Sequence, residues 1–521
     1  MTTVNLSSPP LPRGAEPRAV LAVGLTLSCI LVAWWAALPI QTLVKWIPDD
    51  SFYYFQPASI MARGYIPSFD GVHAGNGFNA LWMFLLVPVF KLKTINPDLP
   101  VHVALGLAGA LFVATGYMIY RLLSLLGVTE TMSAYAGATF PLWPSAITTA
   151  VDGEVTPVNV LCLCLLLYYY VKLAWAERGP TPRAAFAFGL LAGLTLLARL
   201  DNALVLTLLA AYYILRRPAR KPARTVALAA AGAAVLIIPW LVWTYSYAGT
   251  VLPASAWAVP MMTRIAYPDA PGLGGWLRSE LHYLRAEIPT FVFYFPLKYA
   301  VFAVYAGALS LAARGGAATR RQLVVLATLL VFIATLFVVN VSVRRYLRLW
   351  HLGAAFAVNW LFLWAALHLA LPDRYRAWVA RGVALALLTF ALADGAHTAR
   401  HPYYPWQHEL RRGGEFARRH PNVRFGAFNA GLAAYYSADN VVDLDGNMNN
   451  AAYDAIRARR LHDYIRSAGV TYIVDYERWV WRYKAFWGRP FAGSVVKVSD
   501  ALDDPAATFG AGNRYAVLKV K

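Results

Sequence analysis

Apolar segments long enough to cross a membrane recur along most of this chain. A helix needs about 20 predominantly apolar residues to cross the hydrocarbon core of a bilayer. Backbone polar groups in lipid must be satisfied internally, which favours helices. The sequence therefore predicts an all-α polytopic membrane domain with about 11 transmembrane helices. The expected spans are 19–39, 101–120, 131–150, 157–172, 184–198, 203–215, 225–245, 291–313, 323–341, 351–371 and 383–396.

Charged residues are sparse for a chain of 521 residues. They make up 14% of it, and hydrophobic residues make up 59%, whereas a soluble domain carries about 25% charged residues. The net charge of +20 includes short basic clusters at 216–224, 314–321 and 374–381. Basic clusters between apolar segments are typical of cytoplasmic loops. We therefore expect contact with membrane lipids and no nucleic acid partner.

The topology that follows has three parts. Residues 1–18 form a basic cytoplasmic tail, residues 19–400 form the transmembrane domain, and residues 401–521 follow it. An odd number of spans puts the C-terminal part on the extracytoplasmic face of the inner (cytoplasmic) membrane. The transmembrane domain then presents two long outer loops, 41–79 and 246–290.

The C-terminal part has a different pattern from the rest of the chain. Short β-branched and aromatic runs, bounded by turn residues, alternate with a helical stretch at 451–468, which is typical of an α/β domain. We therefore expect a small extracytoplasmic α/β domain. Its predicted strands lie at 423–428, 441–444, 471–476, 494–498 and 515–520.

Two adjacent carboxylates, Asp49 and Asp50, lie in the first outer loop, 41–79, directly after the first span. Ionisable groups within membrane segments are costly to bury and are functional by default. A carboxylate within hydrogen-bond reach of an acceptor hydroxyl can take its proton, so the pair can supply a general base. The alternative is that both acids only cap the helix that follows Pro48.

Further polar groups collect at the outer ends of three later spans, on the same side as the acid pair. Arginine forks suit phosphate oxygens, and outer arginines run against the positive-inside bias. The alternatives are interfacial snorkelling and internal salt bridges. The candidate groups are Asp152 and Glu154, Arg199 and Asp201, and the set Arg344, Arg345, Tyr346, Arg348 and His351.

Other residues of the outer face have more than one interpretation. Tyr53 and Tyr54, with Phe52, Phe55 and Trp82, can stack on sugars or form an interfacial aromatic belt. Asn76 can cap a short interfacial helix at 79–91. The turn 443–447 is either solvated or a site for a cation or an acceptor sugar. A divalent cation, Mg²⁺ or Mn²⁺, would be held by Asp50 and Glu154 if the protein uses one. No nucleotide-binding motif occurs.

The first outer loop, DDSFYYFQPASIMARGYIPSFDGVHAGNGFNALW, resembles the loop signature of bacterial GT-C fold membrane glycosyltransferases of the arabinofuranosyl- and mannosyltransferase-like kind. The order of spans is similar to that of protein O-mannosyltransferases and of the lipid A aminoarabinose transferase. Asn79 and Ala80 stand where the pattern usually has His and Pro. Glu154 matches the end of a Gly-Leu-Glu or Gly-Met-Glu triplet, and Asp152 departs from its start.

The resemblance implies a polyprenyl-phosphate-linked sugar donor and an inverting transfer to a glycan, lipid or protein acceptor on the outer face. It also implies Asp50 or Asp49 as the base, an arginine near 344–348 on the donor phosphate, and a hexosyl- or pentosyltransferase activity. We expect a monomer. Two alternatives remain from the sequence: a lipid-linked sugar flippase or transporter, and a non-catalytic membrane scaffold.

Overall fold

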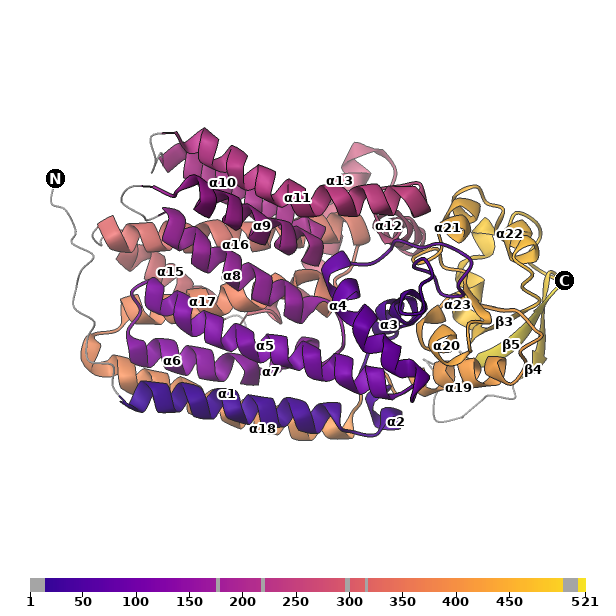
Figure 1. Ribbon diagram of the computed structural model, residues 1–521, viewed down its shortest axis with the longest axis horizontal. Coiled ribbons are helices and arrows are strands. Elements are labelled where there is room, and N and C mark those ends of the chain that lie inside the picture. The colour runs from indigo at the N-terminus through magenta and orange to yellow at the C-terminus, as the bar shows by residue number, and fades with distance from the viewer. Residues whose placement is uncertain (1–14, 175–178, 217–220, 296–299, 314–316, 500–513) are drawn as a thin grey trace.

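The computed structural model describes residues 15–174, 179–216, 221–295, 300–313, 317–499 and 514–521 (Figure 1). Most of the predicted tail 1–18 and parts of the basic clusters 216–224 and 314–321 lie outside these residues. A bundle of long helices fills one end of the molecule, and the C-terminal domain covers the other end.

Helices occur at all eleven predicted spans, in the part of the chain that the structure describes. Seven are long and apolar enough to cross a membrane, which makes this a multi-pass membrane protein. They are α1 (Ala15–Ala36), α5 (Leu99–Leu125), α8 (Thr156–Ala174), α11 (Pro222–Ala248), α16 (Ala317–Arg344), α17 (Gly353–Ala370) and α18 (Asp373–Arg400).

The other four predicted spans are shorter or interrupted. Helices α9 (Pro182–Ala198) and α10 (Ala203–Arg216) are apolar but short. The stretch 131–150 is divided into α6 (Glu130–Thr139), η2 (Phe140–Leu142) and α7 (Pro144–Ala150), because Pro141 and Pro144 interrupt the helical hydrogen bonds. The stretch 291–313 holds the end of α14 (Ile288–Val292) and α15 (Ala300–Ala313).

Close packing of small residues and one largely buried helix hold the bundle together. A Cβ at Gly189 would lie 2.0 Å from the carbonyl oxygen of Ala229, so α9 and α11 touch backbone to backbone. Helix α17 is buried along most of its length, and the indole N–H of Trp360 donates to the carbonyl of Ala136 at 2.9 Å.

The first outer loop contains one short helix and then a helix that begins at the acid pair. Helix α2 (Ile40–Leu43) is followed by α3 (Asp49–Met61), and the interfacial helix expected at 79–91 is α4 (Ala80–Phe90) with η1 (Lys91–Thr94). Phe52, Phe55 and Trp82 are fully buried. They pack in the core, so neither a sugar platform nor a membrane belt describes them.

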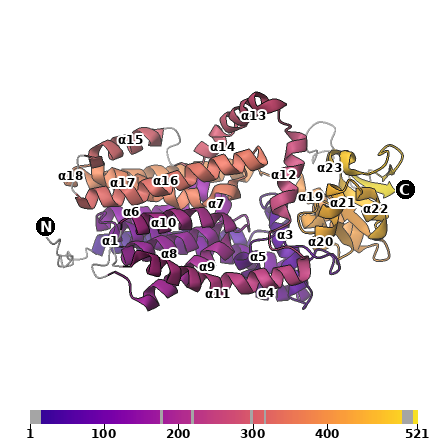
Figure 2. The same ribbon diagram turned by 90° about the horizontal axis from the view of Figure 1, so that it is seen from above.

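The second outer loop lies across the end of the bundle. It holds α12 (Ser255–Ala266) and α13 (Gly272–Ala286), and Figure 2 shows α12 passing between the bundle and the C-terminal domain. Helix α13 is amphipathic, and four large apolar side chains on it are exposed. They are Leu273, Trp276, Leu277 and Leu281. The loop therefore forms a wall at the place where the two domains meet.

The C-terminal domain is a five-stranded sheet flanked by short helices. The strand order is β2-β1-β3-β5-β4; β1 pairs in parallel with β2 and β3, whereas β5 pairs antiparallel with β3 and β4. The predicted helix 451–468 is divided in two, because Arg459 takes a left-handed φ of 53°. The strands are β1 (Phe425–Ala427), β2 (Val441–Asp443), β3 (Tyr472–Tyr476), β4 (Val495–Ser499) and β5 (Tyr515–Val520); the helices are α19 (Gln407–Arg418), α20 (Ala430–Tyr436), α21 (Asn450–Arg457), α22 (Leu461–Ser467), α23 (Glu477–Arg482) and η5 (Lys484–Phe486).

The C-terminal domain and the first outer loop share one hydrophobic core, to which α3, α4, α20 and β1 all contribute. Polar contacts reinforce this joint, including an ion pair of 2.8 Å between Arg424 and Asp70. Gly75 is needed here, since a Cβ at this residue would lie 2.0 Å from the carbonyl oxygen of Met448. The first loop is therefore built into the C-terminal domain.

Candidate active site

Two cavities meet where the helix bundle, the second outer loop and the C-terminal domain come together. The larger, of about 850 Å³, is lined by many aromatic side chains, including Tyr403, Trp406 and Trp479; we call it the aromatic cavity. The smaller, of about 500 Å³, is lined by Arg199, Arg344 and Arg348; we call it the arginine cavity. Asp50 and Arg348 line both, so the two spaces are continuous at these residues.

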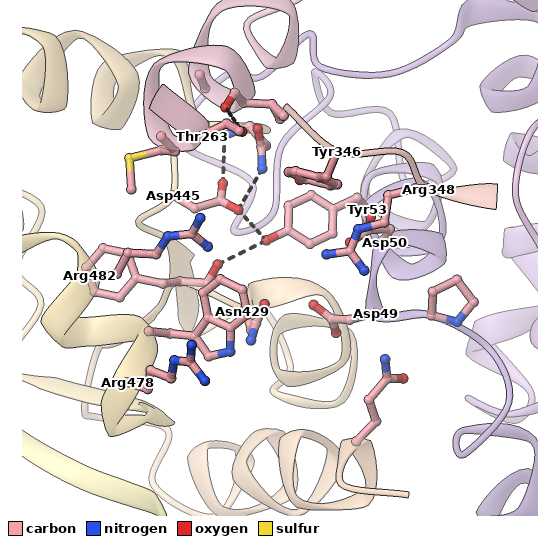
Figure 3. A pocket seen from close by; sticks show the side chains of 18 of the residues that line it. Asp49, Asp50, Tyr53, Thr263, Tyr346, Arg348, Asn429, Asp445, Arg478 and Arg482 are labelled. Carbon is pink, nitrogen blue, oxygen red and sulfur yellow. Dashed lines mark hydrogen bonds between the residues drawn. The ribbon is translucent and has the colours of Figure 1, made fainter. Parts of the chain in front are cut away.

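The two adjacent acids have different surroundings. Asp49 is 4% exposed, and its carboxylate accepts backbone N–H groups from Leu432 at 2.7 Å and Gly431 at 3.2 Å. It therefore caps the first turn of α20 and ties the first loop to the C-terminal domain. Asp50 is exposed to the cavities and makes no hydrogen bond to the described residues. Figure 3 shows Asp50 beside Arg348 and Asp49 apart from them.

The alternative in which both acids cap their own helix does not match this geometry. Helix α3 begins at Asp49 after Pro48, and no side-chain capping bond is made there. Burial raises the pKa of Asp49 to about 8, against the effect of the two N–H donors. The surrounding protein also raises the pKa of Asp50, although Arg348 and Arg344 oppose this by favouring its charged form. A raised pKa makes the Asp50 carboxylate a stronger base.

A turn with left-handed backbone geometry divides the arginine cluster after α16. Arg345 has a φ of 63°, and its buried guanidinium pairs with Asp269 at 2.7 Å and Glu280 at 2.5 Å. Arg344 and Arg348, in contrast, line the arginine cavity. Arg345 therefore does not lie with the predicted donor-binding residues; it fastens the second outer loop to this turn.

His351 and Arg199 complete the basic side of the arginine cavity. The backbone N–H of Arg348 donates to Nδ1 of His351 at 3.0 Å, so Nδ1 is an acceptor and the proton of a neutral ring lies on Nε2. Arg199 pairs with Asp201 at 2.7 Å and donates to the carbonyl of Trp350 at 2.9 Å. Arg199 is thus partly neutralised, and it holds the turn that carries Tyr346 and Arg348.

Glu154 lines the arginine cavity, but Asp152 does not line either cavity. Asp152 accepts the backbone N–H of Glu154 at 2.8 Å, and its own carbonyl accepts the hydroxyl of Ser51 at 2.6 Å. Asp152 therefore shapes the turn before α8. Burial, together with Asp152 and Asp50, raises the pKa of Glu154 well above its ordinary value, which favours the neutral acid.

Asp50 and Glu154, the predicted metal pair, both line the arginine cavity. No group of three or more His, Cys, Asp and Glu side chains comes together among the described residues. A Mg²⁺ or Mn²⁺ ion held by Asp50 and Glu154 stays a prediction.

The predicted aromatic and amide residues differ in position and in hydrogen-bond partner. Tyr53 lines both cavities, and its hydroxyl donates to Asp445 at 2.8 Å; Tyr54 lines the arginine cavity and accepts from Asn79 at 2.7 Å. Asn76 instead accepts the backbone N–H of Ala254 at 2.9 Å, which fixes the second outer loop.

The turn 443–447 is buried, so its interpretation as a solvated turn is wrong. Asp443 and Asp445 are 1% and 7% exposed. Asp443 accepts the backbone N–H groups of Asp445 and Met448, both at 2.9 Å. Asp445 and Asn447 line the aromatic cavity, because the turn packs against the first outer loop.

Sequence reasoning missed the wall of the aromatic cavity that α23 provides. Arg478, Trp479, Trp481 and Arg482 line the cavity from the C-terminal domain, and Figure 3 shows Arg478 and Arg482 across it from Asp50. Asn429 also lines it. The sequence feature that could have indicated this wall is the pair of arginines and the pair of tryptophans shortly after strand β3, in RWVWR.

No curated protein matches the sequence. A family model described as a domain of unknown function (DUF8728) matches residues 401–517, which correspond to the C-terminal domain.

Three solved structures illustrate the similarity of fold. An Archaeoglobus fulgidus oligosaccharyltransferase AglB, in complex with an inhibitory peptide and a dolichol-phosphate, has a TM-score of 0.59 at 11% identity, covering 91% of this chain and 71% of that one. The A. fulgidus oligosaccharyltransferase tethered to an acceptor peptide gives 0.57 at 12%, covering 90% and 70%. ArnT from Cupriavidus metallidurans, bound to undecaprenyl phosphate, gives 0.51 at 13%, covering 97% and 98%. These are GT-C fold glycosyltransferases, and the chain has the GT-C fold.

Proposed function

We propose that the protein is an inverting glycosyltransferase that moves a sugar from a polyprenyl-phosphate donor to an acceptor hydroxyl. One observation carries the proposal: Asp50 is the carboxylate shared by the arginine and aromatic cavities among the described residues that line them. A base must reach the acceptor oxygen while the leaving phosphate is held nearby. A carboxylate at the junction of a basic and an aromatic space satisfies both needs.

The reaction assigns each group one task. The acceptor oxygen bonds to the anomeric carbon of the donor sugar while its proton passes to the Asp50 carboxylate. The bond between the anomeric carbon and the phosphate oxygen breaks, and its electron pair leaves with the phosphate. Attack from the face opposite the leaving group inverts the anomeric carbon.

The arginine cavity is assigned to the donor phosphate. Arg344 and Arg348 line it, and neither makes an ion pair with the residues that the structure describes. The Nε2–H of His351 supplies a further donor in the same cavity. Guanidinium groups that stabilise the charge developing on a leaving phosphate act mainly in the transition state. The lipid-bound phosphates of two structural neighbours are consistent with this assignment.

The aromatic cavity is assigned to the acceptor, which is a glycan, lipid or protein of the cell envelope. In this arrangement the N-terminal tail is cytoplasmic, and the C-terminal domain lies on the extracytoplasmic face of the inner membrane. The enzyme works as a monomer. Residues of α3 and α12 line both cavities, and these two helices lie at one end of the bundle (Figure 1). A flippase would need polar groups near the bilayer midplane instead.

The test is transfer from a panel of radiolabelled polyprenyl-phosphate hexoses and pentoses into membrane acceptors. Wild type is compared with Asp50→Asn, each with and without a chelator. Label in the acceptor fraction that disappears in Asp50→Asn supports the proposal, and the active donors identify the sugar. If wild type binds the lipid donors but transfers none of them, the glycosyltransferase is excluded and the flippase is favoured. The chelator arm detects an added metal requirement.

A further inference from the structure

The wall of the aromatic cavity formed by α23 has no task in the transfer step. Its side chains lie on the C-terminal domain, across the cavity from Asp50 (Figure 3). Two of them are cationic, Arg478 and Arg482, and two are indoles, Trp479 and Trp481. The acid on the same helix, Glu477, is occupied, since it pairs with Lys497 at 2.7 Å.

One of the two cationic groups on this wall, that of Arg482, is placed over an aromatic ring, and Arg478 is exposed. The guanidinium of Arg482 lies 5.2 Å from the ring centroid of Trp479, and Arg482 makes no ion pair with the described residues. Trp481 is 55% exposed, and its ring lines the cavity. An indole face with arginines beside it favours a ligand that combines a sugar ring with negative charge.

Two buried amide atoms of residues that line the same cavity have no hydrogen-bond partner among the residues that the structure describes. They are Nδ2 of Asn429, which is a donor, and Oδ1 of Asn447, which is an acceptor, and both residues line the aromatic cavity. Buried polar atoms are normally paired, so an unpaired donor and acceptor at one cavity indicate a missing partner. A sugar hydroxyl both donates and accepts hydrogen bonds and would satisfy such atoms.

We propose that the α23 wall is a subsite for an anionic saccharide unit of the acceptor. This inference rests on the proposed transferase function and narrows its acceptor class. Arg478 and Arg482 bind a carboxylate or phosphate on the sugar, Trp481 packs on its ring, and Asn429 and Asn447 bind its hydroxyls. The reacting hydroxyl lies on a neighbouring unit, because Asp50 is on the opposite wall. The cavity of about 850 Å³ is near the upper end of the size of ligand sites, which suits more than one sugar ring.

The experiment measures binding by the full chain in nanodiscs, using calorimetry and no donor lipid. The probes are trigalacturonate, a monophosphate of maltotriose, uncharged maltotriose and hexa-aspartate. The variants are Arg478→Gln, Arg482→Gln and the double substitution. Arg466→Gln is the matched control, because Arg466 is an exposed arginine of the same domain and does not line either cavity.

We expect an anionic saccharide to bind at least ten times more tightly than maltotriose in wild type and in Arg466→Gln. The double variant should lose this preference, and added salt should weaken it. The tighter of the two anionic saccharides identifies the anion as carboxylate or phosphate. Equal binding of charged and uncharged saccharides overturns the proposal, as does a preference that survives the double substitution. Hexa-aspartate binding as tightly as trigalacturonate would overturn the saccharide assignment.

This binding measurement needs no sugar transfer, so it succeeds or fails separately from the proposed activity. Selective binding with no transfer from any donor would support the subsite and exclude the proposed glycosyltransferase activity. Sugar transfer together with equal binding of charged and uncharged saccharides would support the glycosyltransferase activity and exclude the subsite.

Discussion

Substituting each acid of the pair by asparagine should produce two opposite phenotypes. Asp49 accepts two backbone N–H groups of α20, at 2.7 and 3.2 Å. Asparagine keeps one acceptor oxygen and presents an NH₂ group to the other N–H, which leaves a buried donor unpaired. That costs about 1 to 3 kcal/mol, a large part of the roughly 5 to 15 kcal/mol that stabilises a folded domain.

Asp50→Asn should leave stability nearly unchanged, because Asp50 is exposed to the cavities and makes no hydrogen bond to the described residues. Loss of the base should lower kcat by about 100- to 10,000-fold, which corresponds to roughly 3 to 5 kcal/mol of transition-state stabilisation.

The assay pairs thermal unfolding in detergent with single-turnover transfer well below the melting temperature. Asp49→Asn should melt several degrees lower than wild type and keep kcat within about tenfold. Asp50→Asn should melt like wild type and be nearly inactive. The reasoning is refuted if Asp49→Asn melts normally and is the inactive variant, since Asp49 would then be the base and Asp50 would not.

Three further outcomes follow from the same geometry. Arg348→Lys should raise the donor KM about tenfold, since lysine loses the guanidinium fork on phosphate; an unchanged KM would remove Arg348 from the donor site. Asp49, with a pKa of about 8 when folded and near 3.9 when unfolded, is neutral in the folded protein over a range where the unfolded chain is ionised. The melting temperature should therefore fall as the pH rises from about 4 to about 8, and Asp49→Asn should show a shallower fall over the same range. Gly75→Ala should cost about 1 to 3 kcal/mol, because its Cβ would lie 2.0 Å from the Met448 carbonyl oxygen; Gly274→Ala, with open space around it, is the control, and equal melting of the two would contradict the close contact.

Much of the fold could be predicted from the sequence because the signals are local. A run of apolar residues predicts a helix wherever it packs, and the pattern of residues 423–428 or 515–520 already favours a strand. The helix interruptions in 131–150 were also visible as Pro141 and Pro144. The lengths of the spans were harder to predict from the sequence, since contacts with neighbouring helices determine where a short apolar helix ends.

The candidate site was predictable as a set of residues but not as an arrangement. Asp49 and Asp50 are neighbours in the chain, and only the contact of Asp49 with α20, 382 residues away, gives them different surroundings. Arg345 has the same residue type as Arg344, and its left-handed backbone turns it toward Asp269 and Glu280. Contacts between distant segments determine both outcomes, and no local pattern reports them.

The union of the first loop with the C-terminal domain also has a consequence for biosynthesis. Helix α20, whose N–H groups Asp49 accepts, is made only after every transmembrane helix has left the ribosome. Residues 41–79 therefore lack their final partners until the last quarter of the chain has been synthesised and folded. Such distant contacts form slowly. A truncated or misfolded product would lack an organised loop, so activity would be restricted to chains whose synthesis has been completed.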